Sequence, residues 1–397
     1  MNEISIKIGK EIKIDYLTTT FEFLVFEREK ELEVVDNLVE GFRLYLNIRK
    51  ERVIERSYNK GGYRYFYELG DGVFLKLCGP LNAMGNNTCS LEMKGEGCRE
   101  FERNNPDKSW KQFLVFLRGA YDVRASRVDI AVDDFSGDVI TFDYIEDKLR
   151  RKMFTSSFKK SPCVGGNDEE GKSYTFGKRK KGSRTNMQLC IYEKHKEQLS
   201  KGKENIQPYW TRYEMRFMHE KAAYILDAII DSFRGKINYP EKEIIPEGEE
   251  GFKILASRLL YGMLDIKDES TYDSSNKNKI PTDPKWLAFV EDVKKAKIPA
   301  PEKKEPRFYK YDKYFHQTSS NYFVLMLMEA KGNIRQLFKM FSKEIVGAIT
   351  DVEDNEKKIN KINAYAIEKN LDTCDAKFLT DSKCKLIKYL DEEELPF

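Results

Sequence analysis

The periods of hydrophobic and polar positions predict a chain in which antiparallel strands alternate with amphipathic helices. Strands are expected where β-branched and aromatic residues cluster or alternate with polar ones, and helices where apolar residues recur every three or four positions. The expected strands cover residues 12–27, a hairpin at 61–79 that turns at Gly70, Asp71 and Gly72, and residues 88–95, 126–134, 172–177, 186–194 and 209–217. The expected helices cover residues 29–46, 108–121, 140–153 and 218–234.

Two stretches, 12–121 and 124–234, share this order of strands followed by a helix. Strands with one apolar face need a covering layer, which the amphipathic helices can provide. We therefore predict an α+β fold with a central antiparallel β-sheet backed by helices. The two stretches would make the sheet pseudo-duplicated, although no sequence repeat demonstrates this.

A change in composition after residue 238 predicts a domain boundary. Residues 239–252 are rich in proline and acids, and a polar loop at 266–284 follows a short helix. We therefore divide the chain into a first domain at 1–238, a linker with a short helix at 239–284, and a last region at 285–397.

The last region, 285–397, is expected to be smaller and mostly helical. A short helix starts at Trp286, and the basic, proline-rich residues 294–308 should be extended. Helices are expected at about 319–346 and 352–369, followed by an acidic tail. We interpret this region as auxiliary, with DNA or a partner protein as its ligand.

The composition limits the class of protein without choosing a function. About a third of the 397 residues are charged, yet the net charge is only +3, so local patches matter more than the total. Frequent lysine, tyrosine and phenylalanine suit a nucleic-acid surface, but they also follow from a low-GC genome. No stretch reaches the roughly 18 apolar residues of a membrane span, no signal peptide is visible, and the seven cysteines form no CxxC pair. We expect a cytoplasmic protein with reduced thiols and no membrane partner.

Several catalytic classes lack their residues in this chain. There are only three histidines and no GxSxG motif, which disfavours serine or cysteine hydrolase chemistry. The sequence has no GxxxxGK[ST] loop for a nucleotide and no HExxH zinc motif. Paired histidines of the His-hydrophobic-His kind, which bind metal in well-known DNA nickases, are absent as well.

Three of the expected strands carry polar residues on one face. If strands 126–134, 186–194 and 209–217 are neighbours, these faces converge on one floor. The floor would contain Arg127, Asp129, Asp133, Gln188, Cys190, Tyr192, Lys194, Arg212, Glu214 and Arg216.

Such a floor suits phosphoryl transfer at a phosphodiester. Asp129, Asp133 and Glu214 offer the oxygen ligands that Mg²⁺ or Mn²⁺ prefers. Tyr192 could then attack the phosphate, with Lys194 or the metal lowering a phenol pKa that is ordinarily near 10.

Each feature also has an ordinary structural interpretation. Asp129 could pair with Arg127 or Arg212, and Glu214 with Arg212 or Arg216. The turn KRKKGSR could follow a DNA backbone or could be a solvated hairpin tip. Its cations are Lys178, Arg179, Lys180, Lys181 and Arg184.

Five segments in order carry a resemblance to a known family. IDYLTTTF, MKGEGCREFE, SRVDIAVDD, YTFGKRKKGSR with LCIYEK, and WTRYEMRF resemble successive motifs of the trans-acting replication initiators (Rep_trans). The resemblance covers about residues 12–235. It implies a metal-dependent DNA nickase of the kind found among rolling-circle plasmid initiators and conjugative relaxases.

The resemblance also assigns roles to single residues. Tyr192 corresponds to the tyrosine that cuts one strand and stays bound to its 5′ phosphate. Arg127, Asp129 and Asp133 match the family's Arg-hydrophobic-Asp strand, and Arg212 with Glu214 its Arg-Tyr-Glu strand. Together with the floor and the turn, this gives the following expected site: catalytic Tyr192, Lys194 and Arg127; metal ligands Asp129, Asp133 and Glu214; DNA-binding Lys178, Arg179, Lys180, Lys181, Arg184, Arg212, Arg216 and Arg99.

The resemblance leaves several points open. Cys190 replaces a residue that is often basic in the family, and Gly95, Gly97, Cys98 and Arg99 are expected in a tight turn. Origin DNA, double- and single-stranded, is the expected ligand, with a host helicase and a second copy of the chain as partners. Initiator and relaxase are not distinguished, although Ile14 leaves little room for a preceding helix-turn-helix, which favours the initiators. A non-catalytic copy-control protein and a single-stranded RNA-binding protein remain the alternatives.

Overall fold

The computed structural model describes two units, Met1–Pro301 and Glu302–Phe397. Its described residues are 9–23, 31–56, 61–80, 87–177, 186–238, 242–270, 277–291, 293–296, 334–353, 355–356, 358–360, 362–363 and 373–391.

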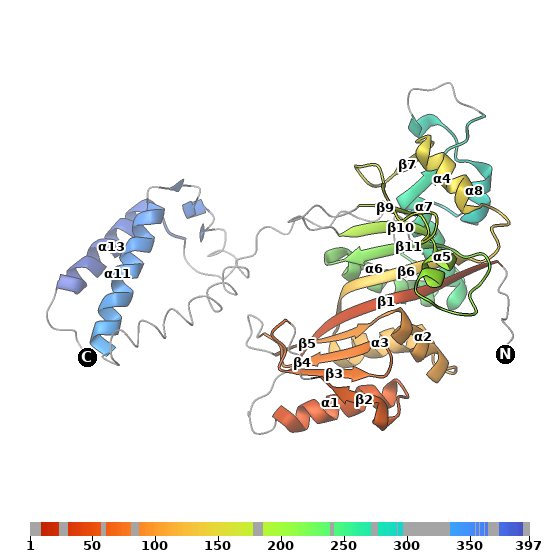
Figure 1. Cartoon of the computed structure of the whole chain (residues 1–397). Coiled ribbons are helices and arrows are strands. Elements are labelled where there is room, and N and C mark those ends of the chain that lie inside the picture. Colours follow the sequence, from red (N-terminus) through yellow and green to blue (C-terminus); the bar gives the residue numbers. More distant parts are fainter. Residues whose placement is uncertain are drawn as a thin grey trace. The chain divides into compact units, whose positions relative to one another are not determined.

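The first unit is built on an antiparallel sheet in which the described strands run β2-β3-β4-β5-β1-β6-β11-β10-β9-β8. Figure 1 shows the strands from β2 to β9 in this order, side by side. Their bounds are β1 Lys10–Phe23, β2 Val53–Glu55, β3 Tyr65–Leu69, β4 Val73–Leu77, β5 Asn87–Met93, β6 Arg124–Asp134, β8 Cys163–Gly165, β9 Ser173–Phe176, β10 Met187–Glu193 and β11 Thr211–Met218. Two small sheets pair β12 Lys236–Ile237 with β13 Glu243–Ile244, and β14 Leu264–Ile266 with β7 Phe154–Ser156.

Helices cover the apolar face of the sheet. Val128, Ile130 and Val132 of β6 are at most 1% exposed, and α6 packs on this strand with Ile225 and Ile229. Burying one such side chain stabilises the fold by about 2 kcal/mol. In the first unit the helices are α1 Glu31–Tyr45, α2 Gly95–Asn104, α3 Trp110–Tyr121, α4 Phe142–Arg150, α5 Lys194–Ser200, α6 Glu220–Phe233, α7 Glu249–Met263 and α8 Pro284–Phe289, with 3₁₀ turns at Lys50–Arg52 and Lys277–Lys279. The prediction of an antiparallel sheet backed by helices is confirmed.

The second unit contains helices α11 Ile334–Glu353 and α13 Ala376–Asp391, which pack on each other. The prediction of a helical C-terminal region therefore agrees with its described part. Helix α13 was not predicted from the sequence, although Asp375 provides an N-cap that accepts from the Phe378 amide at 2.7 Å. Two helices were predicted here, at about 319–346 and 352–369. Residues 319–333 of the first and 364–369 of the second lie outside the described residues.

The prediction of a tight turn at Gly95–Arg99 is wrong, because these residues begin helix α2. The Cys98 amide donates to the Lys94 carbonyl at 2.8 Å, as in a helix. Gly97 is required by packing: a Cβ there would lie 2.7 Å from the Gly72 carbonyl oxygen, in the turn between β3 and β4.

The structure also differs from the predicted division at residues 239–284. Helices α7 and α8 belong to the first unit, which extends to Pro301. Trp286 of α8 is fully buried, and its ring centroid lies 6.2 Å from that of Tyr213 on β11. The proline- and acid-rich composition therefore marks a surface connection, since the chain beyond it returns to complete the core.

Candidate active site

The three strands with polar faces are neighbours, in the order β6-β11-β10. The register places Arg216 opposite Asp129, and Arg212 opposite both Asp133 and Tyr192. Because side chains on one face recur every second residue, the predicted convergence of polar side chains follows directly from this pairing.

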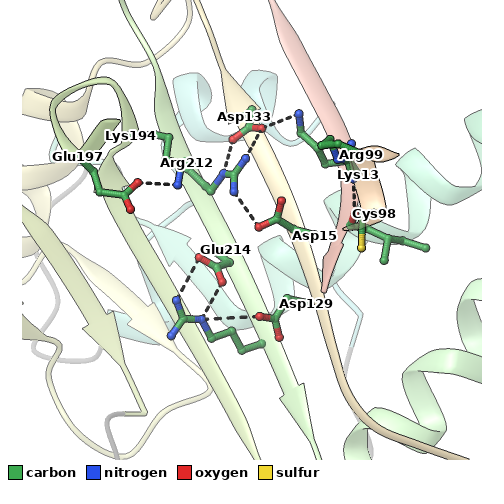
Figure 2. Close-up of polar contacts among 12 residues, drawn as sticks. Lys13, Asp15, Cys98, Arg99, Asp129, Asp133, Lys194, Glu197, Arg212 and Glu214 are labelled. Atoms are coloured by element: carbon green, nitrogen blue, oxygen red, sulfur yellow. Dashed lines mark hydrogen bonds and ion pairs between the residues drawn. The ribbon is translucent and has the colours of Figure 1, made fainter. Parts of the chain in front are cut away.

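Arg212 is the buried centre of one cluster. Its Nε and Nη2 donate to Asp133 at 2.6 and 2.9 Å, and its Nη1 donates to Asp15 at 2.8 Å. Lys13 adds a second cation at 3.0 Å from Asp133. Burial alone would raise the pKa of Asp133, but the charge and hydrogen bonds of Arg212, with Lys13, lower it. Figure 2 shows Asp15 and Asp133 on either side of Arg212.

Asp15 was not predicted as a site residue. The pairing of β1 with β6 shifts between Ile14 and Tyr16, so Asp15 sits at a β-bulge. Burial raises the pKa of Asp15, and the Arg212 charge opposes this rise. A signal was present in the sequence, because the apolar positions change from even numbers, at Ile12 and Ile14, to odd numbers, at Leu17 and Phe21.

Tyr192 belongs to a second cluster on the same face. Its hydroxyl donates to Glu214 Oε2 at 3.0 Å. Arg216 holds the same carboxylate through Nε at 2.8 Å and Nη2 at 3.1 Å. Burial, and then the negative charge of Glu214, raise the pKa of Tyr192 well above its ordinary value, so the phenol is protonated at neutral pH in this arrangement.

Asp129 lies beside the second cluster. Arg127 donates to it through Nε at 3.0 Å and Nη2 at 2.5 Å, and Arg216 Nε lies 3.9 Å away. Burial raises the pKa of Asp129 to about 7, although the Arg127 hydrogen bonds act against the rise. The ion-pair interpretations of Asp129 and Glu214 are thus realised with Arg127 and Arg216.

The carboxylates fit a divalent cation by their chemistry. Asp129 and Glu214 both face the Arg216 guanidinium, so a positive charge is already accommodated between them. Among the residues that the structure describes, no group of three or more His, Cys, Asp or Glu side chains could hold a metal. Mg²⁺ sites commonly use only one or two carboxylates, with water and substrate phosphate completing the shell.

The remaining predicted residues are distributed differently. Strand β10 ends at Glu193, so Lys194 does not share the strand face and is instead the first residue of α5. The Lys194 Nζ pairs with Glu197 at 2.5 Å and lies 5.5 Å from the Tyr192 ring centroid. Arg99 donates to the Ile14 carbonyl and pairs with Glu102 at 2.7 Å. Cys190 is buried opposite Glu214. Lys178, Arg179, Lys180, Lys181 and Arg184 lie outside the described residues.

Comparisons with known proteins agree with this fold. The "Replication initiation factor" family model, Rep_trans, matches residues 123–349. A Bacillus subtilis protein named "Putative DNA relaxase NicK" is 27% identical over 229 residues, which are 55% of this chain and 58% of the relative's length. The solved rolling-circle replication initiator protein of Geobacillus stearothermophilus has a similar fold, with a TM-score of 0.54 and 22% identity over 73% of this chain and 99% of that one. None of the described helices has the length and apolar character needed to cross a membrane.

The family match covers more than half of the 397 residues and includes β6, β10 and β11. This confirms the resemblance seen in the sequence motifs. The chain therefore belongs to the replication initiation factor family, Rep_trans.

Proposed function

We propose that the protein is a metal-dependent DNA strand nickase that starts rolling-circle replication or conjugative transfer. The observation that carries the proposal is the hydrogen bond from Tyr192 to Glu214 at 3.0 Å, on a sheet face shared with Asp129 and three arginines. The family match and the relaxase-like and initiator-like relatives support DNA as the substrate.

Tyr192 is the proposed nucleophile. Its Oη attacks the scissile phosphorus in line; an Oη–P bond forms and the bond from phosphorus to the 3′ oxygen breaks. The 5′ phosphate stays on the protein. Glu214 accepts the phenol proton across the existing hydrogen bond, and the departing 3′ oxygen takes a proton from water.

Asp129 and Glu214 are the proposed ligands of a divalent cation. A bound Mg²⁺ or Mn²⁺ would polarise the phosphate and lower the phenol pKa, which burial otherwise raises. Asp133 has a different proposed role, which is to hold Arg212 in place through two hydrogen bonds. Because Asp133 also pairs with Lys13, its carboxylate is not available to a metal.

The arginines of the face are proposed to bind DNA phosphates. Arg127 and Arg216 keep 34% and 32% of their side chains exposed, so they can reach a ligand while paired with Asp129 and Glu214. Arg212 is 6% exposed and is better placed to orient the neighbouring Tyr192. The cations at 178–184, a host helicase and a second copy of the chain remain predictions.

A supercoiled plasmid carrying the cognate origin tests the proposal. Wild-type protein with Mg²⁺ or Mn²⁺ should convert it to the open-circular form, and Tyr192→Phe should not. Tyr174→Phe is the matched control, because the Tyr174 hydroxyl also donates to a glutamate, Glu146 at 3.0 Å, but this tyrosine is buried on the apolar face. Nicking by Tyr192→Phe would exclude the assignment, and origin binding without nicking by the wild type would favour a copy-control protein.

A further inference from the structure

The polar face of the sheet continues from the Tyr192 site into the N-terminal half. Register places Arg127 opposite Thr18, Thr18 opposite Glu92, and Glu92 opposite Phe74. These residues form one row across β6, β1, β5 and β4. The row starts on the strand that carries Asp129, so the two halves present one continuous face.

Partly exposed aromatic residues lie on this half of the face. Phe74 of β4 and Phe66 of β3 are partly exposed, whereas Leu75, on the opposite face, is fully buried. The rings of Phe66 and Phe74 lie 5.7 Å apart. Tyr16 of β1 is also partly exposed and lies between them and the site.

A cationic side chain lies close to each of these three rings. Lys94 Nζ lies 4.4 Å from the Phe74 centroid, Lys76 Nζ 5.8 Å from that of Phe66, and the Arg127 guanidinium 4.0 Å from that of Tyr16. Aromatic rings paired with cations along one groove or face are the arrangement by which proteins hold single-stranded nucleic acid, with bases on the rings and phosphates on the cations.

The carboxylates of this region are already neutralised. Glu92 accepts from Tyr16 at 2.5 Å and pairs with Lys76 at 2.7 Å, and Glu68 pairs with Arg56. Lys94 is exposed and pairs with no carboxylate among the described residues. The charge left for a ligand on this part of the face is therefore positive, which favours an anionic ligand such as a phosphate backbone.

We propose that Tyr16, Phe66, Phe74, Lys76 and Lys94 form a stacking surface for the single-stranded DNA that flanks the nick. This inference rests on the proposed function, because it assigns the ligand of the same sheet face. From β10, which carries Tyr192, the surface reaches β4 after five strand spacings, about 24 Å at roughly 4.8 Å each. It would hold several nucleotides beyond the cut without reading their sequence.

The test measures binding without cleavage, in a Tyr192→Phe background with a fluorescent single-stranded origin oligonucleotide. Adding Phe66→Ala and Phe74→Ala should weaken binding by at least about 10-fold, since one lost stacking contact corresponds to roughly 5- to 150-fold. Restoring the rings with Phe66→Tyr and Phe74→Tyr should recover the affinity, which separates stacking from misfolding. Leu32→Ala with Leu44→Ala, on the outer face of α1 at 59% and 60% exposure, is the matched control and should bind normally.

The oligonucleotide series decides what binds the surface. A short oligonucleotide centred on the nick should bind equally to the protein with both phenylalanines and to the protein with the alanine pair, because it does not reach Phe66 and Phe74. Equal binding of the long oligonucleotide by both proteins would overturn the inference, as would an equal loss on fully duplex DNA or tighter binding of RNA of the same sequence. These binding results do not depend on nicking by Tyr192. The stacking surface can therefore be refuted while the nickase function stands, and the nickase function can be refuted while the stacking surface stands.

Discussion

Asp129→Asn should stabilise the fold while it impairs nicking. Burial raises the pKa of Asp129 from 3.8 to about 7, so the folded protein prefers the neutral carboxyl. At about 1.4 kcal/mol per unit, ionising this group costs the folded state roughly 4 kcal/mol relative to the unfolded chain. Asparagine resembles the neutral form and avoids this cost.

The sign of the pH dependence follows from proton binding. Between pH 4 and 7 the folded wild type holds a proton on Asp129 that the unfolded chain has released, so stability falls as pH rises. The free energy of unfolding of Asp129→Asn minus that of the wild type should therefore be near zero at pH 4 and grow to a few kcal/mol by pH 8.

Asp133→Asn is the matched control, with the opposite sign. Arg212 and Lys13 lower the pKa of Asp133 against the effect of burial, so its ionised form contributes stability above pH 4 that is lost as pH falls further. This variant should be less stable than the wild type at pH 8.

Urea unfolding at pH 4, 6 and 8 measures these differences. Trp110, Trp210 and Trp286 are the only tryptophans, and all lie in the first unit, so their fluorescence reports on that unit. A lower stability of Asp129→Asn than of the wild type at pH 8 would refute the reasoning, because the Arg127 ion pair would then outweigh the cost of burying the charge.

Three further predictions concern the site and its support. Arg212→Leu should lower the free energy of unfolding by about 3–5 kcal/mol in urea titrations, because it leaves Asp15 and Asp133 buried without their main partner; an effect below 1 kcal/mol would contradict the buried-pair account. Chelation should abolish nicking. At subsaturating Mg²⁺ the initial nicking rate should rise as the pH passes through about 7, because burial raises the pKa of Asp129 to about 7 in the metal-free protein and its proton competes with the cation. A rate that falls over this range would exclude Asp129 as a ligand. Gly97→Ala should lower the melting temperature, because its Cβ would meet the Gly72 carbonyl oxygen at 2.7 Å, whereas Gly119→Ala, with open space around it, should be neutral or stabilising.

The periodicity of the sequence was sufficient for the sheet and for most of the residues on its polar face, but not for Asp15 or Lys194. Residues 126–134 alternate without interruption, so the face that carries Arg127, Asp129 and Asp133 follows from the period of two. The sequence does not show which strands pair, so the placement of β6, β11 and β10 side by side was an assumption. Only the structure shows that these strands are neighbours.

Other features depend on tertiary contacts that a local pattern does not contain. The bulge at Asp15 shifts the register by one residue and brings a fourth carboxylate onto the face. Strand β10 ends one residue before Lys194, so this cation belongs to helix α5 and pairs with Glu197. The arginine that each carboxylate pairs with likewise depends on contacts between strands, such as Arg212 with Asp133 and Arg216 with Asp129.

The most direct test of the central claim is to identify the residue that becomes linked to DNA. A single-stranded origin oligonucleotide incubated with the protein and Mg²⁺ or Mn²⁺ should give a covalent adduct, and mass spectrometry of the digested adduct should place the nucleotide on the peptide that contains Tyr192. The account predicts a 5′-phosphotyrosine at Tyr192 and no adduct from Tyr192→Phe. An adduct on another residue, or undiminished adduct formation by Tyr192→Phe, would contradict it.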